Sequence, residues 1–217
     1  MRFRLAAALP LLLLLGACDP AEDRFTVRGT ITDPLATEPG SVVYMTGPDG
    51  PIDSVLVSDS HFSFSGSIDK TKLLTVYLSY PERNEWDKSF TAVFVPDSEV
   101  IGIDLDYPVT VTGSPLTDAV NDYQEQLLKL YYEPELDMED LDLDEEQLDS
   151  LVRVVQLPKI LDLSRQTYLS NTDNALGMQA FFLLVTELER EELETLLDQG
   201  DDFIKKNEKI KELIENK

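Results

Sequence analysis

The stretch "DSVLVSDSHFSFSG", residues 53 to 66, has the pattern of two β-strands joined by a tight turn. Asp59 and Ser60 are turn-forming residues at its centre. Phe62 and Phe64 are two positions apart, so they would lie on the same face of the second strand and pack together, and Gly66 closes the stretch. The stretch therefore predicts a β-hairpin.

The strand pattern extends on both sides of this hairpin, over residues 25 to 113. In "FTVRGTI" the apolar residues Phe25, Val27 and Ile31 alternate with polar ones, as in a half-buried strand. The further β-like runs are "SVVYMTG", "IDSVLVS", "HFSFSGSI", "LLTVYLSY", "FTAVFVP" and "VIGIDLDY". Short spacers rich in Pro, Gly, Asp and Ser separate them, without helical crossovers, which favours an antiparallel sandwich or barrel.

The apolar period changes at Ser114, where a helix start is predicted by a capping serine followed by Pro115. An apolar helical stripe follows, made of Leu116, Val120, Tyr123, Leu127 and Leu130. A second helix is predicted to begin near Asp144 and to end or kink at Pro158. Three shorter helices are expected over 174–186, 189–199 and 201–216, with Gly200 at the C-terminal end of the middle one. The fold class is therefore α+β: a β module at 25–113 and a helical module at 114–217.

The first residues have the layout of a secretory signal peptide: Arg2 and Arg4 precede the apolar run from Leu5 to Leu15. This run is too short to span a bilayer, which needs roughly 20 apolar residues. The sequence Leu15-Gly16-Ala17-Cys18 resembles the bacterial lipobox. That resemblance implies that residues 1–17 are removed, that Cys18 is acylated, and that 18–24 form a short tether.

Cys18 is the single cysteine of the 217 residues. Once acylated it leaves no thiol, so the sequence excludes a disulfide within the monomer and a Cys-x-x-Cys redox site. Several acyl chains together make a stable membrane anchor, so we expect a lipoprotein of the bacterial cell envelope, on the periplasmic face or the cell surface. The sequence does not decide between the inner and the outer membrane.

The chain is strongly acidic, with 18 basic and 42 acidic residues and a net charge of −24. Loss of Arg2 and Arg4 with the signal peptide would leave 16 basic residues against 42 acidic ones. Such a charge repels phosphates, so nucleic acid and anionic lipid head groups are poor partners. Contact with the membrane is expected through the acyl chains alone.

Four segments together resemble a family known as domain of unknown function 4369: "FTVRGTI", "VYM", "DSVLVSDSHFSFSG" and "YLSNTDNALGMQAFFLL". The resemblance covers residues 24 to 114 and, more loosely, the helices. It implies the N-terminal part of lipid-anchored thioredoxin-like thiol-disulfide proteins, and it carries no catalytic residue. Two departures stand out: no thioredoxin fold follows before Lys217, and Ser60 replaces the usual glycine of the hairpin turn. We therefore expect the accessory half without the enzyme.

Two features of the sequence resemble parts of a metal site, but each is better explained without a metal. The acidic run Asp140 to Glu146 resembles a calcium loop, but the sixth and twelfth positions hold Glu145 and Leu151 instead of Gly and Glu. It is better explained as a solvated loop before a helix. His61, the single histidine, sits beside the predicted turn and is expected to be exposed. We predict no metal and no cofactor.

The aromatic residues Tyr77, Tyr80, Trp86 and Phe90 are the candidate binding surface, for a glycan or a peptide. The alternative is that these strand aromatics belong to the core. The sequence has no phosphate loop, and no carboxylate pair stands out for glycoside hydrolysis, although a hydrolase using scattered carboxylates is a third hypothesis.

The sequence therefore favours a non-enzymatic, lipid-anchored binding or scaffolding protein with an unidentified protein, peptide or glycan partner. The alternative is an accessory subunit that works in trans with a thioredoxin-like protein.

Overall fold

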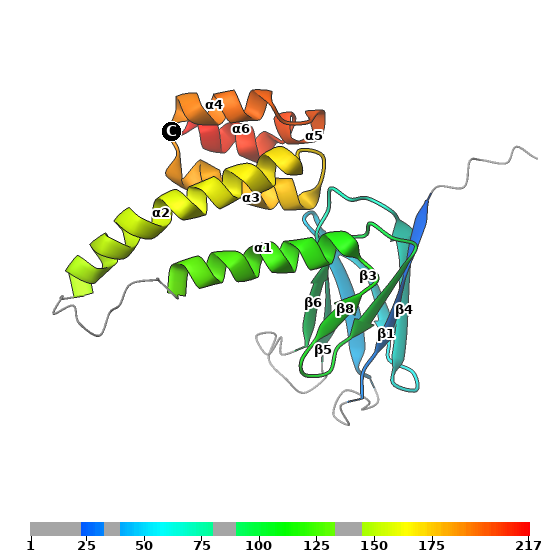
Figure 1. The fold of residues 1–217 in the computed structure, drawn as a ribbon. Coiled ribbons are helices and arrows are strands. Elements are labelled where there is room, and N and C mark those ends of the chain that lie inside the picture. The colour runs from blue at the N-terminus through cyan, green and yellow to red at the C-terminus, as the bar shows by residue number, and fades with distance from the viewer. Residues whose placement is uncertain (1–22, 33–39, 80–89, 133–144) are drawn as a thin grey trace, which may run out of the picture.

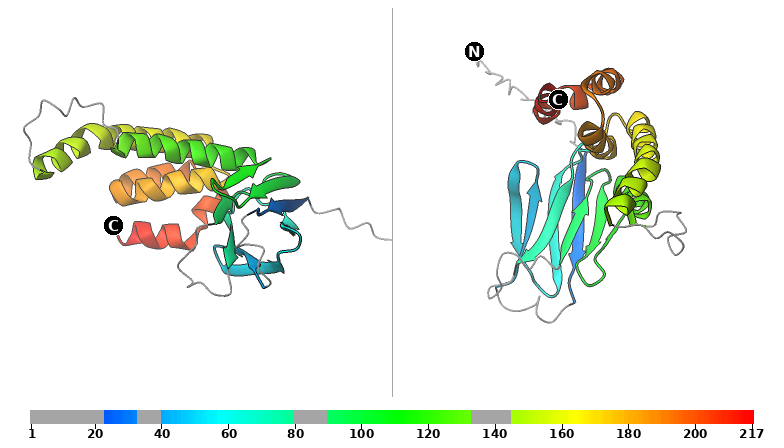
Figure 2. Two further views of the ribbon diagram at one scale, coloured as in Figure 1. Left: turned by 90° about the horizontal axis from the view of Figure 1, so that it is seen from below. Right: turned by 90° about the vertical axis from the view of Figure 1, so that its left-hand side faces the viewer.

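The computed structural model describes residues 23–32, 40–79, 90–132 and 145–217, and it places a β-sandwich at one end of the molecule and a group of helices at the other (Figures 1 and 2). The first sheet contains, in spatial order, β4 (His61–Ser67), β1 (Arg24–Thr30), β7 (Val100–Asp104) and β8 (Thr110–Thr112). The second contains β3 (Gly50–Leu56), β2 (Val42–Gly47), β5 (Leu74–Ser79) and β6 (Thr91–Phe94). The helices are α1 (Pro115–Tyr132), α2 (Glu145–Ser170), α3 (Ala175–Glu187), α4 (Arg190–Asp198), α5 (Asp202–Lys205) and α6 (Glu208–Glu215). The α+β fold class is confirmed.

One strand pair departs from the antiparallel pattern that the short spacers predicted. β1 and β7 are parallel, in the register Thr26↔Val100 to Thr30↔Asp104, whereas the other described pairs are antiparallel. A parallel pair needs a long connection. Here the chain supplies it by building β2 to β6 between the two strands. β8, which has only three residues, is absent from the predicted runs.

The core of the sandwich lies between the two sheets and follows the predicted alternation. Phe25, Val27 and Ile31 are buried, while Arg28 between them is exposed. Phe62 and Phe64 are also buried, as the pattern of the hairpin indicated. The second sheet contributes the remaining inward side chains, among them Val43, Met45, Val76, Leu78 and Phe94.

Two phenylalanine rings lock β1 to β4, because each lies over a glycine of the other strand. In the register of the pair, Phe25 is opposite Gly66 and Gly29 is opposite Phe62. A Cβ atom at Gly29 would lie 1.9 Å from Cζ of Phe62, and one at Gly66 would lie 2.6 Å from Cε1 of Phe25. The rings fill the space that side chains would otherwise occupy, which explains why phenylalanine and glycine recur together in this stretch.

The turn between β3 and β4 is a two-residue turn in which both central residues have positive φ. The φ angles are 49° at Asp59 and 64° at Ser60. Ser58 and His61 exchange both backbone hydrogen bonds across it, at 3.1 and 2.9 Å. Positive φ at both centres defines type I′, in which glycine is usual at the second position. The predicted turn is confirmed, but the predicted hairpin is wrong, because its two strands enter different sheets: β3 pairs with β2, and β4 pairs with β1.

The helical region confirms some predicted boundaries and corrects others. α1 begins at Pro115, as expected, and α3 begins directly after Asn174, whose side chain caps it. α2 continues through Pro158 to Ser170, so the prediction that the helix could end at this proline is wrong. Pro158 has no N–H group, so the carbonyl group of Val154, four residues earlier, lacks its partner within the helix. Both residues are exposed, so water can bond to this carbonyl group in place of the missing N–H. The expected helix over 201–216 is two helices, because Asn207 caps a new one: its side chain accepts the Ile210 N–H at 3.1 Å.

The helices form a second core around Tyr168 and Phe181, whose ring centroids are 4.7 Å apart. The Tyr168 hydroxyl donates to the Leu196 carbonyl at 3.1 Å, and burial raises the pKa of Tyr168 to about 12. Gly200 is buried beneath this hydroxyl, because a Cβ there would lie 2.3 Å from the Tyr168 oxygen. The glycine that the sequence suggested for the end of a helix is therefore required by a close contact.

The two regions are joined where α1 begins. The Ser114 hydroxyl donates to the Val95 carbonyl, and the Val95 N–H donates to the Thr117 hydroxyl, both at 2.9 Å. The Asp97 carboxylate accepts the Leu116 N–H at 2.8 Å, at the helix end where negative charge is favourable. Because Ser114 and Thr117 are buried, these bonds attach α1 firmly to the loop that follows β6.

Replacing Gly29 by alanine tests the packing of phenylalanine on glycine. We expect Gly29→Ala to lower the free energy of unfolding by about 1–3 kcal/mol, because the new methyl group overlaps the buried Phe62 ring. Chemical denaturation measures this. The matched control is Gly47→Ala, where the nearest atom is the end of the exposed Ile52 side chain, and the loss should stay below about 1 kcal/mol. Equal losses in both variants would contradict the packing described here.

Replacing Ser60 by glycine tests the type I′ turn. We expect Ser60→Gly to raise the free energy of unfolding by about 0.5–1 kcal/mol, since glycine relieves the positive φ of 64°. Ser65→Gly, on an ordinary strand position of β4, is the control and should lower it by about 0.5–1 kcal/mol. A loss of stability in Ser60→Gly would show that the turn has another conformation.

Candidate functional site

The outer face of the second sheet carries a stacked pair of tyrosines. Tyr44 of β2 and Tyr77 of β5 are direct cross-strand neighbours, with ring centroids 5.4 Å apart and an angle of 17° between the rings. Both point outward because their chain neighbours, such as Val43 and Val76, point into the core. Both rings are half-buried. The pair therefore presents a flat aromatic surface beside solvent.

Apolar side chains extend this surface on both sides of the tyrosines. Val42 and Leu56 are paired across β2 and β3, and Leu56 is 68 % exposed. Val93 of β6, on the same outer face, is 45 % exposed. We call this set the tyrosine face: Val42, Tyr44, Leu56, Tyr77 and Val93. Exposed aromatic and aliphatic groups that are contiguous on one sheet are typical of a binding surface.

The structure divides the four aromatic residues that were predicted to form a binding surface. Tyr77 lies on the tyrosine face. Phe90 is partly buried and packs against the sandwich core, in line with the alternative interpretation. Tyr80 and Trp86 lie outside the described residues. The sequence prediction missed Tyr44. Its neighbours Val43 and Met45 are apolar core residues, so the alternation along the strand could have indicated that the Tyr44 side chain points outward.

A groove of about 490 Å³ opens at the edge of the sandwich, between β3 and β4. Val55 and Leu56 line it from the second sheet, and Gly29 and Phe62 line it from the first. His61, the residue after the turn, also lines it. The groove exists because the chain crosses from one sheet to the other at this turn, so no backbone ladder of described strands closes this edge.

The opposite edge is flanked by a helix. β6 and β8, the edge strands of the two sheets on that side, contact each other, and β6 also contacts α1. Figure 1 shows β4 on the side of the sandwich turned away from α1. Among the described residues, the edge formed by β3 and β4 is therefore the one turned away from α1.

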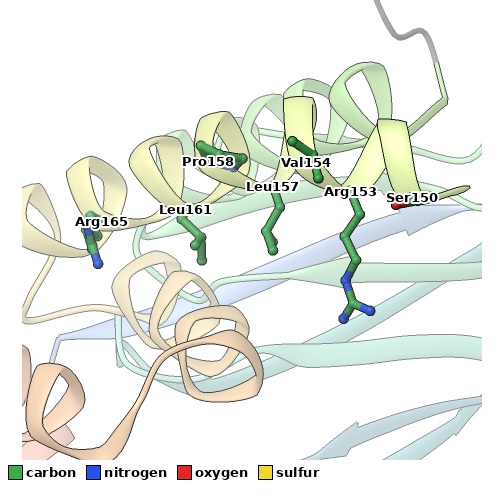
Figure 3. Close-up of a pocket in the computed structure, with 7 residues that line it drawn as sticks. All are labelled: Ser150, Arg153, Val154, Leu157, Pro158, Leu161 and Arg165. Carbon is green, nitrogen blue, oxygen red and sulfur yellow. The ribbon is translucent and has the colours of Figure 1, made fainter.

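A second groove, of about 480 Å³, runs along α2 (Figure 3). Figure 3 shows Leu157 and Leu161 in one row with Arg153 and Arg165. The guanidinium of Arg165 lies 2.8 Å from the Glu192 carboxylate, and that of Arg153 lies 4.0 Å from Glu187. Because both arginines bind carboxylates of α3 and α4, this groove is a seam of helix packing.

No chemical centre appears among the described residues. They contain no group of three His, Cys, Asp or Glu side chains placed to hold a metal ion. His61 is exposed, and its Nδ1 lies 2.5 Å from the Asp59 carbonyl, as a turn residue would. Most of the acidic run Asp140–Glu146 lies outside the described residues, as do Cys18 and the lipobox residues 15–17. None of the described helices is long and apolar enough to cross a bilayer.

An acidic group with a perturbed pKa at the junction has a structural role. The ammonium of Lys70 is hydrogen-bonded to Asp173 and holds the pKa of that carboxyl below its usual range. The Lys70 carbonyl also accepts the Ala175 N–H at 2.8 Å. These contacts tie the loop before β5 to the first turn of α3. The pair is about half exposed, so its contribution to stability is small.

The geometry defines a two-sheet β-sandwich with an attached helical region, an exposed tyrosine face and one open edge. Residues 25–120 match the family described as domain of unknown function DUF4369, and the chain carries this domain there. The match ends inside α1, just beyond the hydrogen bonds of Ser114 and Thr117 that attach this helix to the sandwich. No curated protein matches the sequence.

Proposed function

We propose that the protein is a lipid-anchored bacterial envelope protein whose β-sandwich is a non-enzymatic binding module. The observation that carries the binding role is the tyrosine face, a contiguous aromatic and aliphatic surface with Leu56 and Val93 strongly exposed. Its partner is a protein, a peptide or a glycan. Stacked tyrosines suit each of these, because their rings contact apolar faces while the hydroxyls reach polar groups.

The anchor and the module are close together in the chain. β1 begins at Arg24, six residues after Cys18. Six extended residues span at most about 20 Å, so acylation of Cys18 would hold the sandwich near the membrane surface. The acyl chains would supply the affinity for the lipid, since the acidic chain is repelled by anionic head groups.

A second candidate function is that of an accessory subunit acting in trans with a thioredoxin-like thiol-disulfide protein. The DUF4369 domain favours it, because the resemblance noted above associates this domain with such proteins. Pull-down from detergent-solubilised membranes separates the two candidates: recovery of a thioredoxin-like protein by the wild-type chain, and its loss in Tyr77→Ala, would assign the tyrosine face to that partner.

Replacing Cys18 tests the anchor. We expect the full chain to be recovered with membranes and to carry acyl groups on Cys18, as shown by mass spectrometry of its N-terminal peptide. Cys18→Ala should abolish the acylation, because no other cysteine is present. Ala21→Ser, three residues further on, is the control and should be acylated normally. A wild-type mature chain with a free Cys18 thiol would refute the anchor.

Site-directed photo-crosslinking tests the binding surface. With a photo-reactive phenylalanine analogue in place of Tyr77 in living cells, we expect a discrete adduct whose yield falls about tenfold when Tyr44→Ala is added. The control position is Tyr107, which is 92 % exposed and lies outside the tyrosine face. Equal crosslinking from positions 77 and 107, or no adduct from position 77, would contradict the proposed function.

A further inference from the structure

The two strands that flank the open edge differ in how they protect their backbone. β3 has three protective features. Pro51 lacks an N–H group, and the pairing of β3 with β2 is irregular opposite Met45 and Thr46. The third is Asp53, whose carboxylate accepts the Ser54 N–H at 2.7 Å. Proline, irregular pairing and a charged side chain are the devices by which natural sheets block further strand pairing. β4, "HFSFSGS", contains no proline, no charged Asp, Glu, Lys or Arg and no irregular pairing.

Two hydrogen bonds fix which backbone groups of β4 are used by β1. The Ile31 N–H donates to the Ser60 carbonyl at 2.9 Å, and the Ile68 N–H donates to the Asp23 carbonyl at 2.8 Å. Both continue the register of the β1–β4 ladder. Hydrogen-bonded and non-bonded pairs alternate in an antiparallel ladder. The even-numbered residues of β4 therefore bond to β1.

The odd-numbered residues Ser63, Ser65 and Ser67 consequently direct their N–H and C=O groups away from β1, toward the open edge. Within the described parts of the chain, no backbone partner is found for these groups. The Ser63 hydroxyl is turned the other way and donates to the Val27 carbonyl at 2.8 Å. Beside this edge lies the groove whose apolar walls include Val55 and Phe62.

We infer that β4 binds an extended segment of another polypeptide, which adds as a fifth strand to the first sheet. The three serines offer a row of backbone donors and acceptors, which only another strand can match along its length. The segment would place alternate side chains over Val55 and Phe62, and these should be apolar, while the others face solvent. This inference rests on the proposed binding role and deepens it, and the site it adds borders the tyrosine face at Leu56.

The charge of the chain argues for a different polypeptide instead of a second copy. Two copies joined edge to edge at β4 would bring together two bodies with a net charge of −24 each. A partner segment that is neutral or basic meets no such repulsion. The uncharged sequence of β4 allows either at the contact itself.

A peptide selection with matched proline variants tests the inference. The full chain in detergent micelles is used to select from a display library of random heptapeptides, and the enriched peptides are titrated against the variants. Ser65→Pro removes an N–H group at the edge of β4 without removing a bond to β1. We expect it to weaken binding about tenfold or more. Ser54→Pro, which removes an N–H group from the edge of β3, should change affinity less than about twofold.

Each outcome decides the inference. Equal affinity for wild type and Ser65→Pro, an equal loss in Ser54→Pro, or no enriched peptide would overturn it. Concentration-dependent dimerisation of the wild type that Ser65→Pro abolishes would also overturn it, in favour of a second copy. If Ser65→Pro does not fold, nuclear Overhauser contacts between the bound peptide and the Ser63 and Ser65 amides of the wild type decide instead. If the peptide test fails but crosslinks still form from position 77, the strand-binding site on β4 is rejected and the proposed binding function of the tyrosine face is retained.

Discussion

The packing of Phe25 on Gly66 and of Phe62 on Gly29 holds β1 and β4 together, and much of the sandwich depends on it. β1 lies between β4 and β7 in its sheet, so its position sets the inner face on which the core is built. Each ring occupies the space that a side chain of the neighbouring strand would need. A shift of the β1–β4 register by one residue would turn the polar residues of β4 toward the core. It would also place each ring opposite a residue that has a side chain instead of opposite a glycine. The same packing places β4 at the edge of its sheet. The backbone groups of Ser63, Ser65 and Ser67, which face away from β1, therefore point toward this edge.

The helical region is attached to the sandwich through a few buried polar contacts. The bonds of Ser114, Thr117 and Asp97 with neighbouring groups align α1 with the loop after β6, and Lys70 aligns the start of α3. All of these contacts involve the starts of α1 and α3, and Lys70 lies only three residues after the end of β4. Among the described residues, α1 therefore braces the sandwich at its β6 edge. A membrane tether of a few residues before β1 would present the tyrosine face and the β3–β4 edge close to the bilayer.

Local patterns in the sequence predicted the elements well, and the pairing of elements poorly. Alternation identified the strands and the inward phenylalanines, and the serine–proline pair marked the start of α1. Alternation gives no information on partners, so neither the parallel β1–β7 pair nor the change of sheet at Asp59 and Ser60 could be foreseen. For the same reason Tyr77 was predicted as a surface residue without Tyr44, which joins it only through the β2–β5 register. Apolar spacing also predicts the ends of helices poorly. α2 continues through Pro158, because the proline lies on an exposed face of the helix. The predicted helix over 201–216 is divided in two, because the Asn207 side chain caps a new helix.

In the first sheet, β4 is an edge strand with one row of backbone groups bonded to β1 and, among the described residues, the other row open. Amide hydrogen exchange of the unliganded full chain in micelles, followed residue by residue by nuclear magnetic resonance, tests it most directly. We expect slow exchange at Phe62, Phe64 and Gly66 and fast exchange at Ser63, Ser65 and Ser67, in strict alternation along the strand. Uniform protection of all six amides would show that this edge of β4 is already covered, and that it cannot accept a further strand.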